Sequence, residues 1–193
     1  MKNYIYALVL LILVSCNSKP KPALEEIISD EFVTITKSMI EVESDSVCLN
    51  LPLEFKIKLP SSVNYLSANL IDNGHYLSTP NDFLIYNKEQ PKKVIFDFEQ
   101  YLLVGKPFKI IIKKRNHLVS KKDAQELLKK YSKKKSLNNL KKGDTINLIP
   151  YDIFRKDNPN FLNELRRIED KIRITTSCKG EDFFNSQDFK INW

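Results

Sequence analysis

Glycine, cysteine, histidine and tryptophan are all scarce in this chain of 193 residues. It has four glycines, three cysteines, two histidines and one tryptophan. The chain holds no glycine-rich phosphate-binding loop and no dinucleotide-binding motif. His75 and His117 are not spaced as metal ligands, and no Gly-x-Ser-x-Gly nucleophile motif occurs. The sequence therefore indicates no cofactor, no metal site and no recognisable catalytic motif.

Hydrophobic residues, in contrast, are plentiful enough for a folded domain. They make up 42% of the chain, against 28% charged residues, which is an ordinary balance for a globular protein and excludes wholesale disorder. The length suits one domain that buries its own core. The net charge is +7, which favours acidic partners or surfaces.

The first sixteen residues have the pattern of an export signal. Lys2 gives a short positive start, and residues 4–14 form an unbroken apolar run of eleven. This length suits a signal peptide and falls short of the roughly 20 residues that a membrane-spanning helix needs. The run ends in Leu13-Val14-Ser15-Cys16, which resembles the lipobox of bacterial lipoproteins. The resemblance implies that residues 1–16 are a lipoprotein signal peptide and that the mature chain begins at Cys16, which carries lipid.

The same resemblance implies a location. In enteric lipoproteins an aspartate after the cysteine retains the protein in the inner membrane, whereas this chain has Asn17. Surface-export signals of Bacteroidota lipoproteins are acidic just after the cysteine, and here the first acidic residue is Glu25. We therefore expect a lipid anchor in the outer membrane with the domain facing the periplasm. Residues 17–28 are polar and proline-bearing at their start, and are expected to form an extended tether.

Strict alternation from Val47 to Leu59, where every odd position is apolar, is the clearest structural pattern. It predicts a half-buried strand with one face in solvent. Pro52 has no N–H to donate, which predicts that this strand lies at a sheet edge or is broken there. Asn73-Gly74 predicts a tight hairpin turn. Further strands are predicted at 32–40, 63–71, from 76 onward, and at 83–86, 94–98, 108–113, 171–176 and 189–193.

The period changes to that of a helix between about residues 120 and 168. Ser120 and Asp123 form a capping-box pattern, and the residues after them place Ala124, Leu127, Leu128 and Tyr131 on one apolar face. A short helix is predicted at 136–142, with Gly143 as its C-terminal cap. Another is predicted to start with Asn158 as cap and Pro159 in the first turn.

These patterns together predict a single domain over residues 29–193, mainly β with a helical insertion (α+β). The number and spacing of the short strands favour an antiparallel β-sandwich. On strand spacing alone, an immunoglobulin-like arrangement fits best.

Two pairs of residues are candidates for chemistry. Cys48 and Cys178 are the cysteines left in the domain, and an oxidising compartment would permit a disulfide between them. However, Cys48 is expected on the wet face of its strand, whereas Cys178 continues an apolar face, so a bridge requires a local twist. Asp97 and Glu99 are spaced to share one face of a strand, as an acid pair of a glycosidase would be, but such pairs are common on solvated strands.

Charge segregation is the one distinctive feature of the domain. Residues 106–142 hold fourteen lysines and arginines against only Asp123 and Glu126, while the rest of the chain after Ser15 is net acidic. Four lysines are predicted opposite the apolar helix face, at Lys122, Lys129, Lys130 and Lys133. They form either a solvated face or a docking surface for an acidic protein or anionic lipid headgroups. Nucleic acid is not expected, because no stacking aromatics are interleaved with these lysines.

Two classes of function follow. The first is a non-catalytic envelope lipoprotein that binds a partner, for which the basic helix is a candidate surface. The alternative is a periplasmic hydrolase whose site is assembled only in three dimensions. A concave pocket with convergent polar groups would distinguish the second class from the first.

Overall fold

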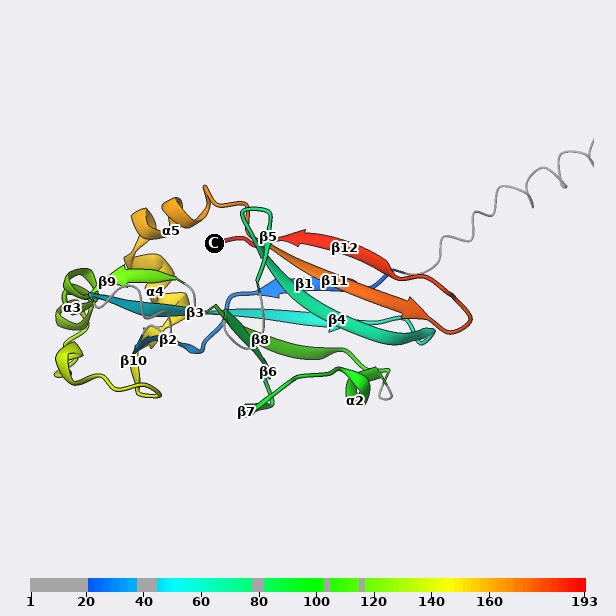
Figure 1. Cartoon of the computed structure of the whole chain (residues 1–193), viewed down its shortest axis with the longest axis horizontal. Helices are drawn as coiled ribbons and strands as arrows, with labels where there is room; N and C mark the ends of the chain where they lie inside the picture. Colours follow the sequence, from blue (N-terminus) through cyan, green and yellow to red (C-terminus); the bar gives the residue numbers. More distant parts are fainter. Residues whose placement is uncertain (1–20, 38–44, 78–81, 103–104, 115–116) are drawn as a thin grey trace, which may run out of the picture.

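Two antiparallel sheets and a group of short helices build the protein (Figure 1). The computed structural model describes residues 21–37, 45–77, 82–102, 105–114 and 117–193. The larger sheet contains β1 (Ala23–Ile27), β2 (Phe32–Lys37), β3 (Ser46–Lys58), β6 (Phe83–Asn87), β7 (Gln90–Val94), β8 (Phe108–Lys114), β9 (Leu118–Ser120) and β10 (Thr145–Pro150). The smaller sheet contains β4 (Val63–Asp72), β5 (His75–Tyr76), β11 (Lys171–Cys178) and β12 (Asn185–Lys190). The expected β-rich class with antiparallel sheets is confirmed.

The larger sheet has the strand order β10-β2-β3-β8-β6-β7, with β1 and β9 also paired to β3, and the smaller sheet has the order β12-β11-β4-β5. Immunoglobulin domains divide seven or nine strands in a different order, so the immunoglobulin-like arrangement is not the topology observed. Strand spacing reports how long the strands are, and it does not specify which strands pair.

Within the described residues, four helices flank the sheets, namely α2 (Glu99–Leu102), α3 (Lys121–Lys130), α4 (Tyr151–Asp157) and α5 (Pro159–Leu165). Three of them, α3 to α5, gather at one end of the larger sheet (Figure 1). The helix predicted at 136–142 is only a 3₁₀ turn at Leu137–Asn139. The helical excursion is also interrupted by β10, which returns to the sheet and pairs with β2. β10 has only six residues, and so short an alternation of apolar and polar residues is not recognisable as a strand from the sequence.

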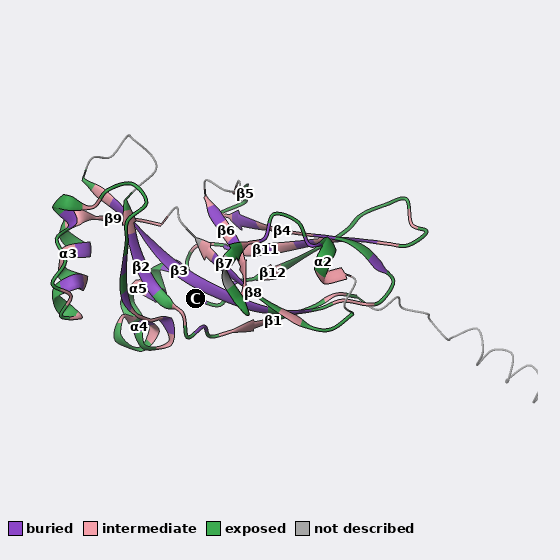
Figure 2. Ribbon diagram, turned by 90° about the horizontal axis from the view of Figure 1, so that it is seen from below, coloured by how far each residue is buried: buried purple, intermediate pink, exposed green. Residues whose placement is uncertain are grey.

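The central strand β3 is buried on both faces (Figure 2). All residues from Val47 to Phe55 are buried, including Cys48, Asn50 and Glu54 at the even positions. The prediction of a wet face was therefore wrong over this part of the strand and holds only at Lys56 and Lys58, which are exposed. Alternation correctly predicts which side faces the main core, but it cannot show that other parts of the chain cover the second side.

Pro52 lies in the middle of the sheet and not at its edge. On one side of β3, β8 pairs along Leu51–Ile57. On the other side, β2 pairs up to Asn50 and β1 pairs from Glu54 onward. The ladder on that side therefore has a gap opposite Pro52, which is the local break that a residue without an N–H favours.

The main core lies between the two sheets and continues beneath α3, α4 and α5. Ile172 and Ile174 of β11 pack in one apolar cluster with Leu53 and Phe55 of β3. The predicted hairpin between β4 and β5 is confirmed, with Asn73 and Gly74 both at positive φ (47° and 83°), as a type I′ turn requires.

The C-terminal part of the expected tether belongs to the domain. Residues Ala23–Ile27 form β1, which pairs with β3, so the expectation of a tether up to residue 28 was wrong from Ala23 onward. Glu26 of β1 accepts hydrogen bonds from the backbone N and the Nδ2 of Asn192, at 2.9 and 3.0 Å. Burial raises the pKa of the Glu26 carboxyl, an effect that these hydrogen bonds partly offset.

The C-terminus is packed into the fold, although its last three residues form no strand. Trp193 is 2% exposed, and its Nε1 donates to Oδ2 of Asp170 at 3.0 Å. Its carbonyl accepts from Nε of Arg166 at 2.6 Å. The alternation of Phe189, Ile191 and Trp193 therefore correctly indicates a built-in end, with Ile191 and Trp193 buried.

Replacing Trp193 with Ala should lower the free energy of unfolding by about 3–5 kcal/mol, because it leaves a cavity in the core and removes the donor to Asp170. Urea unfolding followed by far-ultraviolet circular dichroism measures this loss without relying on the tryptophan. Phe184→Ala is the matched control, since Phe184 is 65% exposed and its loss should cost less than about 0.5 kcal/mol. Equal effects of the two substitutions would contradict the packed C-terminus.

Candidate functional site

The two cysteines of the domain lie far apart. Cys48 is buried in β3 and pairs with Leu118 of β9. Cys178 ends β11 and pairs with Val63 at the opposite end of the fold. Neither forms a disulfide in the part of the chain that the structure describes. The disulfide considered from the sequence is therefore not observed, and the expectation of a solvent-facing Cys48 was wrong.

Asp97 and Glu99 do not share one face of a strand, as the sequence had suggested. The structure has strand β7 at Gln90–Val94, so the residues after Val94 do not continue the strand predicted at 94–98. Glu99 is the first residue of α2. Oδ1 of Asp97 accepts a hydrogen bond from the backbone N of Glu99 at 3.2 Å. This contact is typical of an Asp that turns the chain into a helix. His75 is exposed in the β4–β5 hairpin, and no cluster of three or more metal-binding side chains occurs among the described residues.

Helix α3 begins as the capping pattern predicts. Oγ of Ser120 accepts from the backbone N of Asp123 at 3.0 Å and donates to Oδ2 of the same residue at 2.7 Å. Ala124 and Leu128 are fully buried beneath the helix. The Ser120 hydroxyl therefore caps the N-terminus of α3 through its hydrogen bonds with Asp123.

The four predicted lysines differ in their positions and contacts. Lys122 and Lys129 are exposed on α3 and lie seven residues apart, so they share one ridge of the helix. Nζ of Lys130, in contrast, donates to the carbonyl of Asp157 at 2.8 Å and to Oδ1 of Asn158 at 2.9 Å. Lys133 lies beyond the C-terminal cap of the helix, Tyr131. The exposed pair Lys122 and Lys129 is called the lysine ridge below.

Asn158 joins α3 to the junction of α4 and α5. Its Nδ2 donates to the hydroxyl of Tyr131 at 2.7 Å and to the carbonyl of Phe154 at 2.8 Å. It precedes α5 as predicted, with Pro159 in the first turn, but its side chain makes no capping hydrogen bond to that helix. Burial raises the pKa of the Tyr131 hydroxyl, which keeps it a neutral hydrogen-bonding group.

A cavity of about 670 Å³, called the α3 groove below, lies between α3, β9 and the α4–α5 pair. Its apolar lining includes Leu127, Phe154 and Phe161. The ring of His117 meets that of Phe161 edge to face, with centroids 5.1 Å apart. The polar residues that line the groove are His117, Ser120, Asp123, Glu126, Lys130, Asn158 and Glu164.

Three carboxylates at an apolar groove favour a ligand that has a positive charge beside an apolar part. Ser120 is the hydroxyl that lines the groove, and its Oγ is held in the helix cap by both the backbone N and the carboxylate of Asp123. The arrangement therefore favours binding. Sequence analysis missed this groove because His117, Asp123 and Glu164 come from three separate segments, and no local spacing connects them.

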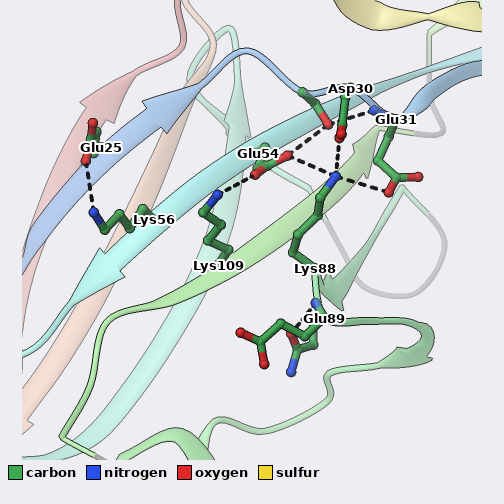
Figure 3. A network of polar contacts seen from close by, with 10 residues as sticks. Glu25, Asp30, Glu31, Glu54, Lys56, Lys88, Glu89 and Lys109 are labelled. Carbon is green, nitrogen blue, oxygen red and sulfur yellow. Dashed lines mark hydrogen bonds and ion pairs between the residues drawn. The ribbon is translucent and has the colours of Figure 1, made fainter.

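A second polar cluster surrounds the buried carboxylate of Glu54 (Figure 3). Its Oε2 accepts from Oγ of Ser29 at 3.1 Å and lies 3.4 Å from Nζ of Lys88. Its Oε1 lies 3.6 Å from Nζ of Lys109. Lys88 also pairs with Glu31 at 3.2 Å and with Asp30. The cluster thus joins the β1–β2 bend, β3, the β6–β7 turn and β8.

Lys88 is held in its charged form by this cluster. Burial acts against its charge, but hydrogen bonds to Asp30 and Glu31 and the charge of Glu54 outweigh that effect and raise the pKa of Lys88 above its usual value. The pKa of Asp30 is lowered by the same hydrogen bond. Because the side chain of Glu54 is 3% exposed, we interpret the cluster as a structural one.

Replacing Lys88 with Met should lower the free energy of unfolding at pH 7 by about 3 kcal/mol, at the lower end of the cost of breaking a buried ion pair, because Lys109 and Ser29 remain beside Glu54. The folded-state pKa of Lys88 is raised, so its stabilisation is complete below about pH 10.5 and is lost as the pH rises through the folded value. The gap between wild type and variant should therefore shrink above about pH 10.5. Urea unfolding at a series of pH values measures it.

Lys56→Met is the control for this prediction. Lys56 pairs with Glu25 at 3.9 Å, and their side chains are 46% and 70% exposed. Its loss should cost less than about 1 kcal/mol. If Lys88→Met costs no more than Lys56→Met, the cluster does not stabilise the fold.

Comparison with known proteins adds no relative for either site. The chain matches no protein-family model, no curated protein and no solved structure.

Proposed function

We propose that this protein is a lipid-anchored lipoprotein of the bacterial cell envelope that acts as a non-catalytic binding module. The lipobox-like residues Leu13–Cys16 support the anchor, although they lie outside the described residues. Within the described part of the chain, no helix is long and apolar enough to cross a membrane. Asn17 favours the outer membrane, with the domain facing the periplasm.

The main structural support for this proposal is that the start of the domain and helix α3 lie at opposite ends of β3. At one end, Lys58 pairs with Ala23, the first residue of β1. At the other end, Ser46 pairs with Ser120, the N-cap of α3. Twelve residue steps at about 3.3 Å each separate these ends by roughly 40 Å along the strand. The chain therefore enters the domain at one end, and α3 lies at the other.

This separation favours an acidic protein as the partner of the lysine ridge over the headgroups of the anchoring membrane. The residues from Cys16 to Lys21 span at most about 18 Å when fully extended. An upright domain on so short a tether holds α3 away from the bilayer. Charges on an exposed ridge chiefly accelerate and select a protein partner, and the α3 groove beside them offers a pocket for a basic side chain of that partner.

Lipid attachment predicts that wild-type protein takes up radiolabelled palmitate in cells and sediments with the outer membrane. Cys16→Ser should abolish both, because the thiol is the attachment point and two or more chains are needed for stable anchoring. Cys178→Ser is the matched control and should keep both. Absence of label from the wild type, or label that persists in Cys16→Ser, would contradict the anchor.

The lysine ridge predicts salt-sensitive binding to acidic polypeptides. With residues 17–193 and poly-glutamate as probe, Lys122→Gln/Lys129→Gln should weaken binding about three- to tenfold at low salt, and the difference should vanish at about 0.5 M salt. Lys130 is kept because it holds Asn158. Lys58→Gln/Lys190→Gln, which changes two exposed lysines away from α3, is the control. Equal affinities of the two double variants would show that the ridge is only a solvated face.

A further inference from the structure

Aromatic side chains gather in solvent at the end of the molecule away from α3. Phe183 and Phe184, in the loop between β11 and β12, are 57% and 65% exposed, and Tyr65 of β4 is 44% exposed. The rings of Tyr65 and Phe184 meet edge to face, with centroids 5.1 Å apart. A patch of large apolar side chains left in water marks an interaction surface. We call these three residues the aromatic end.

The aromatic end lies beside the start of the described chain. Lys21 and Pro22 line a cavity of about 550 Å³ together with Phe183. The backbone N of Lys179 donates to the carbonyl of Ser62 at 2.8 Å, which joins the β11–β12 loop to the β3–β4 turn. The loop and the start of β1 lie in the half of the molecule away from α3 (Figure 1).

The length of chain before Lys21 limits what can cover this surface. Five residue steps separate Cys16 from Lys21. At no more than about 3.6 Å per step, the lipid attachment point lies within about 18 Å of Lys21. A chain anchored at Cys16 therefore keeps Lys21 within about 18 Å of the bilayer surface, so the aromatic end beside Lys21 can reach that surface.

We propose that the aromatic end inserts into the interface of the membrane that carries the anchor. This proposal rests on the lipid anchor of the proposed function. Tyrosine is enriched at the membrane–water interface, and exposed phenylalanines bury their rings at the boundary between headgroups and acyl chains. The charges nearby are mixed, with Lys21 and Lys179 against Glu181 and Asp182, so the contact is apolar. It is therefore expected to resist salt and to need no anionic lipid.

The test imposes the anchor chemically, so that it does not depend on lipidation in cells. A chain of residues 16–193 carrying Cys178→Ser is coupled through Cys16 to a maleimide lipid in phosphatidylcholine vesicles. Cys48 is 4% exposed and is shielded from the reagent. A second set of vesicles contains one quarter phosphatidylglycerol. Failure of the aromatic proposal is thereby distinguished from failure of the lipid anchor, which palmitate labelling tests separately.

A tryptophan placed at the aromatic end reports its insertion. The native Trp193 is 2% exposed and gives a constant background. Phe184→Trp adds a reporter at the aromatic end, and Phe32→Trp adds a control on β2, beside Pro150 at the start of α4, where Phe32 is 43% exposed. Lipids with brominated acyl chains should quench the added fluorescence of Phe184→Trp at least twofold, and that of Phe32→Trp little, in both vesicle types and in 1 M NaCl.

Two results would overturn the proposal. One is equal quenching of Phe184→Trp and Phe32→Trp. The other is a concentration-dependent dimer of residues 17–193, detected by sedimentation, that Phe183→Ser/Phe184→Ser abolishes, because the aromatic end would then bind a second copy of the chain. The thermal melting of each variant is measured alongside, and these exposed positions should leave it nearly unchanged.

Discussion

The burial of β3 on both faces is the constraint on which the rest of the fold depends. Its odd residues fill the core between the sheets, so every polar residue on its other face needs a partner within the protein. Asn50 donates to the hydroxyls of Thr34 and Thr36 at 3.2 and 3.1 Å. Glu54 is surrounded by Ser29, Lys88 and Lys109. A buried carboxylate without such partners would be costly. The contacts with Glu54 therefore fix the positions of the β1–β2 bend, the β6–β7 turn and β8.

The features that sequence analysis predicted correctly depend on residues close together in the chain. Ser120 and Asp123 are three residues apart and cap α3 as expected. Asn73 and Gly74 are adjacent and form the hairpin turn. The Glu54 cluster could not be predicted in this way, because its members come from four separate elements. A glutamate in an alternating strand has the same pattern whether its face meets water or the rest of the chain.

The helical end shows the same limit for the candidate site. Periodicity placed Lys122 and Lys129 on one exposed ridge, and both are exposed. It grouped Lys130 with them, although Lys130 binds Asp157 and Asn158 across the gap between α3 and α4. The pattern around Asn158 and Pro159 predicted the start of α5 but not that the Asn158 side chain turns back to Tyr131. These tertiary contacts join α3 to the α4–α5 junction, and Lys130 and Asn158 line the α3 groove.

The two ends of β3 would compete for the membrane if both attracted it. Attraction between the lysine ridge and an anionic surface is screened within a Debye length of about 8 Å at physiological salt, and it acts only if the domain lies flat. Burial of the aromatic end is not screened, because it depends on the apolar area removed from water. If Cys16 carries lipid as proposed, the short stretch from Cys16 to Lys21 also keeps the aromatic end nearer to the bilayer than α3. In the proposed arrangement, physiological salt therefore favours an upright domain, which leaves the lysine ridge and the α3 groove accessible to a partner in the periplasm.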